Sequence, residues 1–162
     1  MTAHAFIGID PGLSGAIAVI DMRASHINVV DMPLHTITRN GKAKRQLDLY
    51  QLGNWFDLHR NTIKLATIEA VHSMPAQGIT SAFTFGFAAG ALQGLVAGNA
   101  IPMHLVAPLT WKRAFKLTSD KDASRRAASQ LFPAFSHLWA RAKDDGRAEA
   151  VLLAYYGSKL QY

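Results

Sequence analysis

Four carboxylates in this chain could serve as metal ligands. Asp10 follows one apolar run and Glu69 closes another. Asp145 and Glu149 are four residues apart near the end of the chain, which on a helix places them on one face, about one turn apart. Carboxylate oxygens suit Mg²⁺ or Mn²⁺, and two such ions about 4 Å apart suit attack of water on a phosphodiester. The acids therefore predict a two-metal hydrolytic centre.

Each acid also has a purely structural interpretation. Asp10 precedes a Pro-Gly-Leu-Ser-Gly turn and could cap that turn through its own backbone. The pair Asp145 and Glu149 could form a solvated patch near a helix start, because like charges at this spacing repel unless a cation or solvent separates them. For Asp10 alone, and for the pair Asp145 and Glu149 alone, both interpretations remain open.

The elements that must position the acids are predicted from hydrophobic period and turn residues. Strands are expected at 5–10, 15–21 and 26–32 as an antiparallel meander, and at 63–71 and 101–106. Helices are expected at 47–60, 80–98 and 108–115, then from a cap at Ser119 or Asp120 to Pro133, and from about Asp144 to Gly157. This order predicts an α/β fold with a five-stranded mixed sheet flanked by helices.

Residues 36–46 are polar and carry four basic side chains around a glycine turn. The pattern predicts an exposed loop, either merely solvated or in contact with backbone phosphates.

Glycines recur every four residues at positions 86, 90, 94 and 98. On a helix they form one smooth stripe, although each glycine costs about 1 kcal/mol relative to alanine. The stripe predicts a close backbone approach, either to the sheet or to a second subunit. Phe83, Phe85 and Phe87, at the start of the same helix, are most simply core residues.

Composition limits the class of protein. A chain of 162 residues has the size of one domain, residues 1–162. Its net charge is +6, and residues 103–162 hold 10 basic and 5 acidic side chains, so a polyanion such as nucleic acid is the expected partner. No cysteine and no signal-peptide pattern occur, which favours the cytoplasm.

The charge-free stretch from Ala70 to Trp111 raises the question of a membrane span. Its best window, Phe83 to Ile101, holds four glycines, few large aliphatic residues and no Lys or Arg close to either end. A span needs about 20 strongly apolar residues with positive flanks. A buried helix and no membrane partner are therefore predicted.

At these same positions the sequence resembles a known family. Gly8-Ile9-Asp10-Pro11-Gly12, Ile68-Glu69, Met74-Pro75-Ala76-Gln77-Gly78 and Asp145-Gly146-Arg147-Ala148-Glu149-Ala150 are similar, in the right order, to motifs of the RuvC Holliday junction resolvases of the ribonuclease H-like superfamily. The likeness covers residues 6 to about 157. The final acids differ from the two aspartates, three residues apart, of well-known bacterial members. The spacing of Asp145 and Glu149 resembles that of a phage-type variant of the family. The third metal ligand could then be either Asp144 or Asp145.

The resemblance implies a homodimer that nicks opposing strands of a four-way DNA junction with Mg²⁺ or Mn²⁺, two ions in each active site. It implies that the ligands are Asp10, Glu69, Asp145 and Glu149. It also places Lys112 and Lys121 near the scissile phosphate, where lysine could stabilise developing charge. DNA contacts are expected from Arg39, Lys42, Lys44, Arg45, Gln77, Phe83, Phe85, Lys112, Arg113, Lys116 and Lys121.

Two other functions compete with a nuclease. A sugar-kinase or actin-like ATPase also has an Ile-Asp-x-Gly hairpin, but it needs a second lobe with its own phosphate loop, and no second such motif is present. A non-catalytic module that binds branched DNA would retain the fold but not require the acids, and all four are present.

Overall fold

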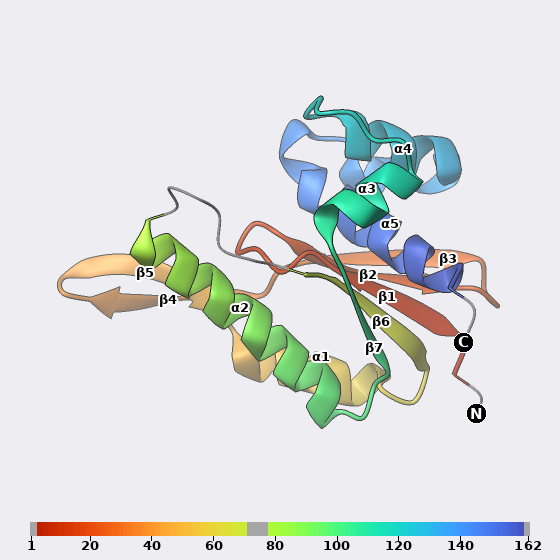
Figure 1. Cartoon of the computed structure of the whole chain (residues 1–162). Helices are drawn as coiled ribbons and strands as arrows, with labels where there is room; N and C mark the ends of the chain where they lie inside the picture. The colour runs from red at the N-terminus through yellow and green to blue at the C-terminus, as the bar shows by residue number, and fades with distance from the viewer. Residues whose placement is uncertain (1–2, 71–77, 161–162) are drawn as a thin grey trace.

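The protein, described here by a computed structural model over residues 3–70 and 78–160, is built on a five-stranded sheet in the order β3-β2-β1-β6-β7 (Figure 1). The strands are β1 Ala5–Ile9, β2 Ala16–Asp21, β3 His26–Asp31, β6 Ile63–Glu69 and β7 Met103–Val106. β1, β2 and β3 are antiparallel neighbours, whereas β6 pairs in parallel with both β1 and β7. The predicted ribonuclease H-like mixed sheet is confirmed.

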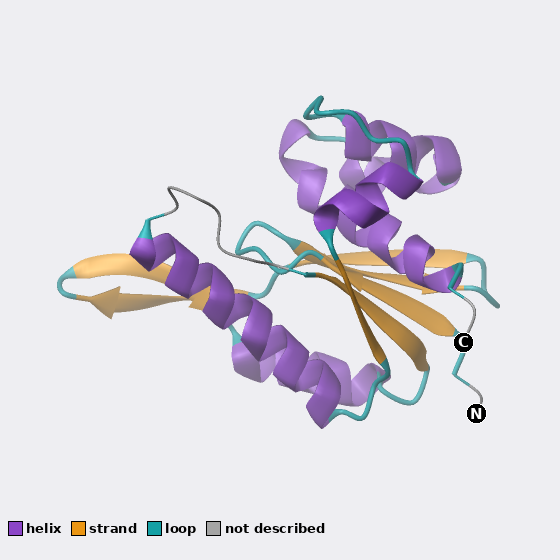
Figure 2. Ribbon diagram, viewed as in Figure 1, coloured by secondary structure: helices purple, strands orange, loops and turns teal. Residues whose placement is uncertain are grey.

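Helices cover both faces of this sheet (Figure 2). Helices α1 and α2 pack on one face, against Ile7, Ile9 and Ile68, while α3, α4 and α5 pack on the other, against Ala16, Ala18 and Ile20. The helices are α1 Leu49–His59, α2 Ile79–Gly98, α3 Pro108–Ala114, α4 Ala123–Leu131 and α5 Asp145–Ser158, with short 3₁₀ turns at Pro133–Trp139 and Ala142–Asp144.

α5 lies unusually close to β1, and Gly8 is the reason. A Cβ built on Gly8 would come within 2.0 Å of the Ala150 carbonyl oxygen and 2.3 Å of the Ala154 nitrogen. Only glycine permits this backbone approach. The consequence is functional, because the contact sets the acid-bearing first turns of α5 beside the end of β1.

Residues 36–46 are not the loop that the sequence predicted. They belong to a separate two-stranded hairpin, β4 Leu34–Arg39 and β5 Lys42–Leu47, which projects beside the first turns of α2 (Figure 1). Asn40 and Gly41 at its tip both have positive φ, 53° and 71°, as a type I′ turn requires. The Asn40-Gly41 pair is a hairpin turn signal in the sequence. The strands were not predicted because most side chains of β5 are exposed, so its sequence lacks the usual alternation of apolar and polar residues.

α2 is buried along one side only, through Ala88, Ala89, Leu92 and Val96. The four stripe glycines face the other way, since a Cβ on any of them would meet nothing within 4 Å among the described residues. The predicted approach of the stripe to the sheet is therefore wrong. By length and composition alone α2 could cross a membrane, and only 22% of its most apolar window is buried, so the prediction of a buried helix holds for one face.

The predicted start of α4 is also wrong. The helix begins at Ala123, after Asp122, and not after Ser119 or Asp120. The Asp120 side chain instead accepts a hydrogen bond from the backbone N–H of Asp122 (3.0 Å), which makes a separate turn before the helix.

Candidate active site

Asp10 lies just beyond the end of β1, in the turn that leads to β2. Its backbone N–H donates to the Ala16 carbonyl (3.0 Å), and a Cβ on Gly15 would lie 2.1 Å from the Asp10 carbonyl oxygen, so the turn is closed tightly around it. The hydrogen bond that the carboxylate accepts from the Gly12 N–H is long, 3.5 Å. Capping its own turn is therefore a minor role for this side chain.

The surroundings of Asp10 disfavour its negative charge. Burial, with the charges of Glu149 and Glu69 nearby, raises the pKa of the Asp10 carboxyl to about 7, against a smaller opposing effect of Lys112. A Cβ on Gly146, in the first turn of α5, would lie 2.9 Å from Asp10 Oδ2. The acid thus sits where the sheet meets α5, in a region that would gain stability from a bound cation.

Glu69 reaches the same edge of the sheet from the neighbouring strand. Ile9 of β1 pairs with Ile68 of β6 in parallel register, so Asp10 and Glu69 follow paired residues. Glu69 Oε2 accepts a hydrogen bond from Trp111 Nε1 (2.7 Å), and Trp111 is fully buried. A rigid indole therefore orients this carboxylate.

Glu149 approaches from α5. Its Oε1 forms an ion pair with Lys112 Nζ and accepts a hydrogen bond from Ser124 Oγ, both at 3.0 Å. Asp145, one turn earlier, accepts from Arg125 Nε at 3.0 Å. Each acid of the helical pair thus has its own cation, which offsets the repulsion expected from their spacing.

Asp144 and Asp145 differ sharply in their surroundings. The Asp144 side chain is 4% exposed and is held by Arg141, through the Arg141 backbone N–H (3.0 Å) and guanidinium (2.8 Å to Oδ1). The Arg141 side chain holds the pKa of Asp144 below its usual range. Asp145 is 44% exposed and lines a cavity of about 330 Å³ together with Glu149, Lys112, Lys121 and Ser124. Asp145 is therefore the more accessible of the two.

These carboxylates can be tested against a divalent metal. No ready-made cage of three acid or histidine side chains occurs within residues 3–70 and 78–160. The donor set nevertheless consists of the hard oxygen ligands that Mg²⁺ and Mn²⁺ prefer. Glu149 and Glu69 lie close enough to Asp10 to raise its pKa. The positive charge of Lys112 partly offsets the negative charge of these acids. The residues therefore fit a divalent metal, whose charge would replace that of the Lys112 ammonium group beside the carboxylates.

The structure separates the predicted DNA contacts into two groups. Lys112 and Lys121 line the cavity beside the acids, and Arg113 and Lys116 are exposed on and just after α3. The second group lies on the hairpin and α2, where Lys42, Lys44 and Arg45 are exposed on β5 and Arg39 ends β4. Gln77 lies outside the described residues.

The aromatic residues at the start of α2 are not core residues. Phe83 is 71% exposed and Phe87 is 41% exposed, while Phe85 is half-buried. The prediction from the sequence that these side chains pack in the core is wrong for Phe83 and Phe87.

Three further residues contact the acids and carry no signal in the sequence. Trp111, Ser124 and Arg125 belong to α3 and α4, and they bind Glu69, Glu149 and Asp145, respectively. The partners in each pair are 20 to 42 positions apart. No local spacing signals such contacts, so only the tertiary structure could reveal them.

A mixed sheet with three antiparallel strands, two parallel strands and acids gathered at one strand edge beside a carboxy-terminal helix defines a ribonuclease H-like protein. The family model described as "Crossover junction endodeoxyribonuclease RuvC" matches residues 6–155. The chain therefore belongs to the RuvC family. A comparison with curated protein sequences gives no significant match.

Solved structures agree on the fold. Thermus thermophilus RuvC in complex with a Holliday junction substrate superposes with a TM-score of 0.58 at 17% identity, over 96% of this chain and 95% of that one. A second structure of Thermus thermophilus RuvC gives 0.53 at 16% identity, over 95% of each chain. The yeast mitochondrial Holliday junction resolvase Ydc2 gives 0.57 at 14% identity, over 94% of this chain and 77% of that one.

Proposed function

We propose that this protein resolves four-way DNA junctions as a metal-dependent endonuclease, with the whole chain acting as one nuclease domain in the cytoplasm. The observation that carries the proposal is the convergence of Asp10, Glu69 and Glu149 from β1, β6 and α5, in a member of a nuclease family. The solved relatives include one bound to a Holliday junction, which supports branched DNA as substrate.

Four acids of this chain would hold the metal: Asp10, Glu69, Asp145 and Glu149. When bound, two Mg²⁺ or Mn²⁺ ions would generate the attacking hydroxide from water and stabilise the leaving oxygen of the phosphodiester. Trp111 keeps Glu69 oriented and Ser124 keeps Glu149 oriented through the hydrogen bonds described above. These supports hold the carboxylates in place before substrate arrives.

Lys112 and Lys121 would act on the phosphate. Lys112 Nζ lies 3.0 Å from Glu149 Oε1, and Lys121 lines the same cavity. A lysine there can stabilise negative charge that develops on the phosphate oxygens. Arg113 and Lys116 continue the positive surface, as a site for an arm of DNA requires.

The nuclease assay is direct. Wild-type protein should nick a synthetic four-way junction in Mg²⁺ or Mn²⁺, symmetrically on opposing strands, and should leave it intact in EDTA. A plain duplex of the same sequence is the control. If the protein binds the junction but never nicks it with either metal, the non-catalytic binding module is the correct function. The family assignment already argues against an ATPase.

A homodimer is the proposed active form, supported by the open face of α2. This helix carries no charged residue, and its stripe of four glycines has open space beside it among the described residues. A smooth apolar helix face of this kind favours close packing against a second copy.

We expect sedimentation at micromolar concentration to give twice the chain mass of 17.6 kDa. Gly90→Arg should shift the protein towards monomer, because the large charged side chain would project from the stripe. Gln51→Arg on the exposed side of α1 serves as the matched control and should remain dimeric. A monomeric wild-type mass would contradict the dimer.

A further inference from the structure

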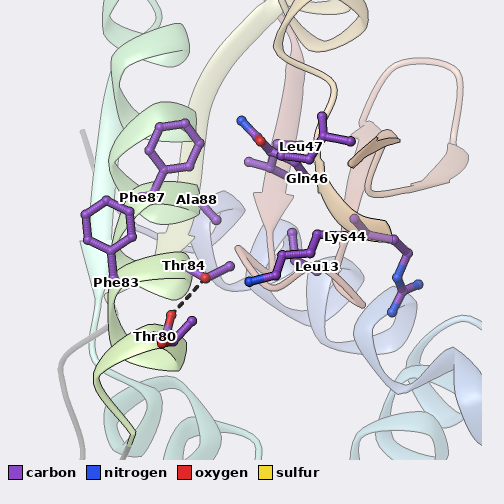
Figure 3. Close-up of a pocket in the computed structure, with 11 residues that line it drawn as sticks. Leu13, Lys44, Gln46, Leu47, Thr80, Phe83, Thr84, Phe87 and Ala88 are labelled. Atoms are coloured by element: carbon purple, nitrogen blue, oxygen red, sulfur yellow. Dashed lines mark hydrogen bonds between the residues drawn. The ribbon is translucent and has the colours of Figure 1, made fainter. Parts of the chain in front are cut away.

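Two cavities of this protein differ in the charge of their walls. The cavity between the β4–β5 hairpin and the first turns of α2 has a volume of about 250 Å³, and its lining includes Lys44 and Phe83 but no acid among the described residues (Figure 3). The cavity beside the first turns of α5, of about 330 Å³, contains Asp145 and Glu149 together with Ser124 of α4. The second cavity is therefore the one suited to a cation.

Arg125 holds one oxygen of Asp145 in a fixed position. Its Nε donates to Asp145 Oδ1 (3.0 Å), its Nη1 donates to the Ala140 carbonyl oxygen (3.2 Å) and its Nη2 donates to the Asp122 carboxylate. All three nitrogens of the guanidinium are engaged, and only 16% of the side chain is exposed. Among the residues that the structure describes, no hydrogen bond or ion pair involves Asp145 Oδ2. Asp145 thus has one oxygen for a cation, and not two.

The donors around Glu149 also converge on a single oxygen. Lys112 Nζ and Ser124 Oγ both lie 3.0 Å from Glu149 Oε1, and Ser124 is buried. In the part of the chain that the structure describes, Oε2 takes part in no hydrogen bond or ion pair. Ser124 and Arg125 are consecutive residues in the first turn of α4. One helical turn therefore fixes one oxygen on each of the two α5 carboxylates.

Asp144 has the opposite arrangement, because protein donors hold both of its oxygens. Its Oδ2 accepts a hydrogen bond from the Arg141 backbone N–H (3.0 Å), and its Oδ1 accepts one from the Arg141 guanidinium (2.8 Å). Asp144 and Asp145 are adjacent in the chain, yet only Asp145 keeps an oxygen without a protein donor among the described residues. The placement of the donors therefore sets how many carboxylate oxygens a metal could bind.

We propose that Ser124 and Arg125 determine which divalent ion the site accepts, by limiting each α5 carboxylate to one metal-binding oxygen. Ca²⁺ takes about six to eight oxygen ligands and often binds both oxygens of one carboxylate, whereas Mg²⁺ and Mn²⁺ favour compact octahedral sites. Carboxylates that each offer one oxygen therefore favour the smaller ions. The inference rests on the proposed function and deepens it, since it assigns the selectivity of the proposed metal site to two positioning residues of α4.

Thermal melting of the full-length protein at pH 8, without DNA, tests this selectivity. Titration with Mn²⁺ alone or with Ca²⁺ alone gives a dissociation constant for each ion from the rise in melting temperature. Wild type should bind Mn²⁺ more tightly than Ca²⁺. In Arg125→Met the ratio of the Ca²⁺ to the Mn²⁺ dissociation constant should fall about tenfold, the scale of effect found when a residue that orients a metal ligand is lost. Ser124→Ala should lower the ratio by a smaller factor, because Lys112 still holds the same oxygen of Glu149.

Arg126→Met is the matched control for Arg125→Met. Arg126 is the next residue of α4, it pairs with Asp120 (2.6 Å), and its described contacts include none of the four proposed metal ligands. The substitution removes the same charge from the same helix. A change of charge alone acts equally on two divalent ions, so the ratio of the two dissociation constants should keep its wild-type value.

The inference is overturned if wild type binds the two ions equally or binds neither, or if a folded Arg125→Met keeps the wild-type ratio. An equal fall of the ratio in Arg126→Met would also overturn it, because charge alone would then explain the selectivity. If Arg125→Met does not fold, Ser124→Ala decides, since it removes only a hydroxyl group. Junction nicking is measured separately, so a protein that nicks but shows no such dependence keeps the nuclease function and loses only this inference.

Discussion

Asp10→Asn should abolish metal-dependent nicking of a four-way junction while leaving junction binding within about threefold of wild type. The substitution removes a charged ligand from the point where β1, β6 and α5 meet, yet preserves size and shape. Metal-ion stabilisation of a phosphoryl transition state is worth several kcal/mol, and about 4 kcal/mol corresponds to ~10³ in rate. Gel assays of nicking and anisotropy of binding, run on the same preparation, separate the two effects.

The matched control for this prediction is Asp57→Asn. Asp57 is an exposed aspartate on α1 that pairs with Arg60 (3.4 Å), and it lies outside the carboxylate cluster. It should nick as wild type does. Nicking by Asp10→Asn at more than about a tenth of the wild-type rate would show that the active site lies elsewhere.

Asp10→Asn should make the folded protein more stable near neutral pH, although it abolishes nicking. The Asp10 pKa of about 7 in the folded protein lies above the ordinary aspartate value of 3.8, so the folded state binds more protons between these values. Stability therefore falls as pH rises from about 4 to about 7, and the loss is complete above that range. The full shift corresponds to ~4 kcal/mol, which partial exposure of the carboxyl reduces to about 2 kcal/mol.

Asp10→Asn should consequently raise the melting temperature at pH 8 in EDTA by about 5 °C, and leave it nearly unchanged at pH 5, where the native aspartate is already protonated. A bound divalent cation should raise the wild-type melting temperature at pH 8 and affect the variant less. A variant that melts below wild type at pH 8 would show that the carboxylate is not disfavoured there.

Asp145→Asn and Asp144→Asn should fail in different ways. Asp145 is accessible in the cavity beside Glu149, so its loss should lower nicking by about 10² with little change in stability. Asp144 is buried and hydrogen-bonded to Arg141, so its substitution should cost about 2 kcal/mol of stability. At a temperature where it remains folded, Asp144→Asn should still nick.

Thermal melting and nicking of the two variants decide between the two candidate ligands. Arg141→Gln, which removes the partner of Asp144, is the matched structural control and should resemble Asp144→Asn. The Arg141–Asp144 contribution is present above the ordinary aspartate pKa and is lost as pH falls through the depressed pKa of Asp144. Normal nicking by Asp145→Asn, together with loss of nicking by a stably folded Asp144→Asn, would reverse the assignment.

The sequence by itself determined the order of the elements and the places of the acids along them. The run around Asp10 predicted a strand that ends in an acid, and the alternation of strands and helices predicted a mixed sheet flanked by helices. These features are local, because strand and helix periods and turn residues are properties of short segments. The sequence already contains the Gly8 that permits close packing of α5 on β1, but only the structure shows why glycine is needed there.

Tertiary structure decided which neighbours each acid has. Asp144 and Asp145 are adjacent in the chain, but in the folded protein Asp144 pairs with Arg141 while Asp145 lines the cavity beside Glu149. It likewise turned the glycine stripe of α2 away from the sheet and exposed Phe83. It also folded residues 34–47 into a hairpin facing α2. Contacts between residues distant in sequence depend on how whole faces pack, and no local pattern of residue types specifies them.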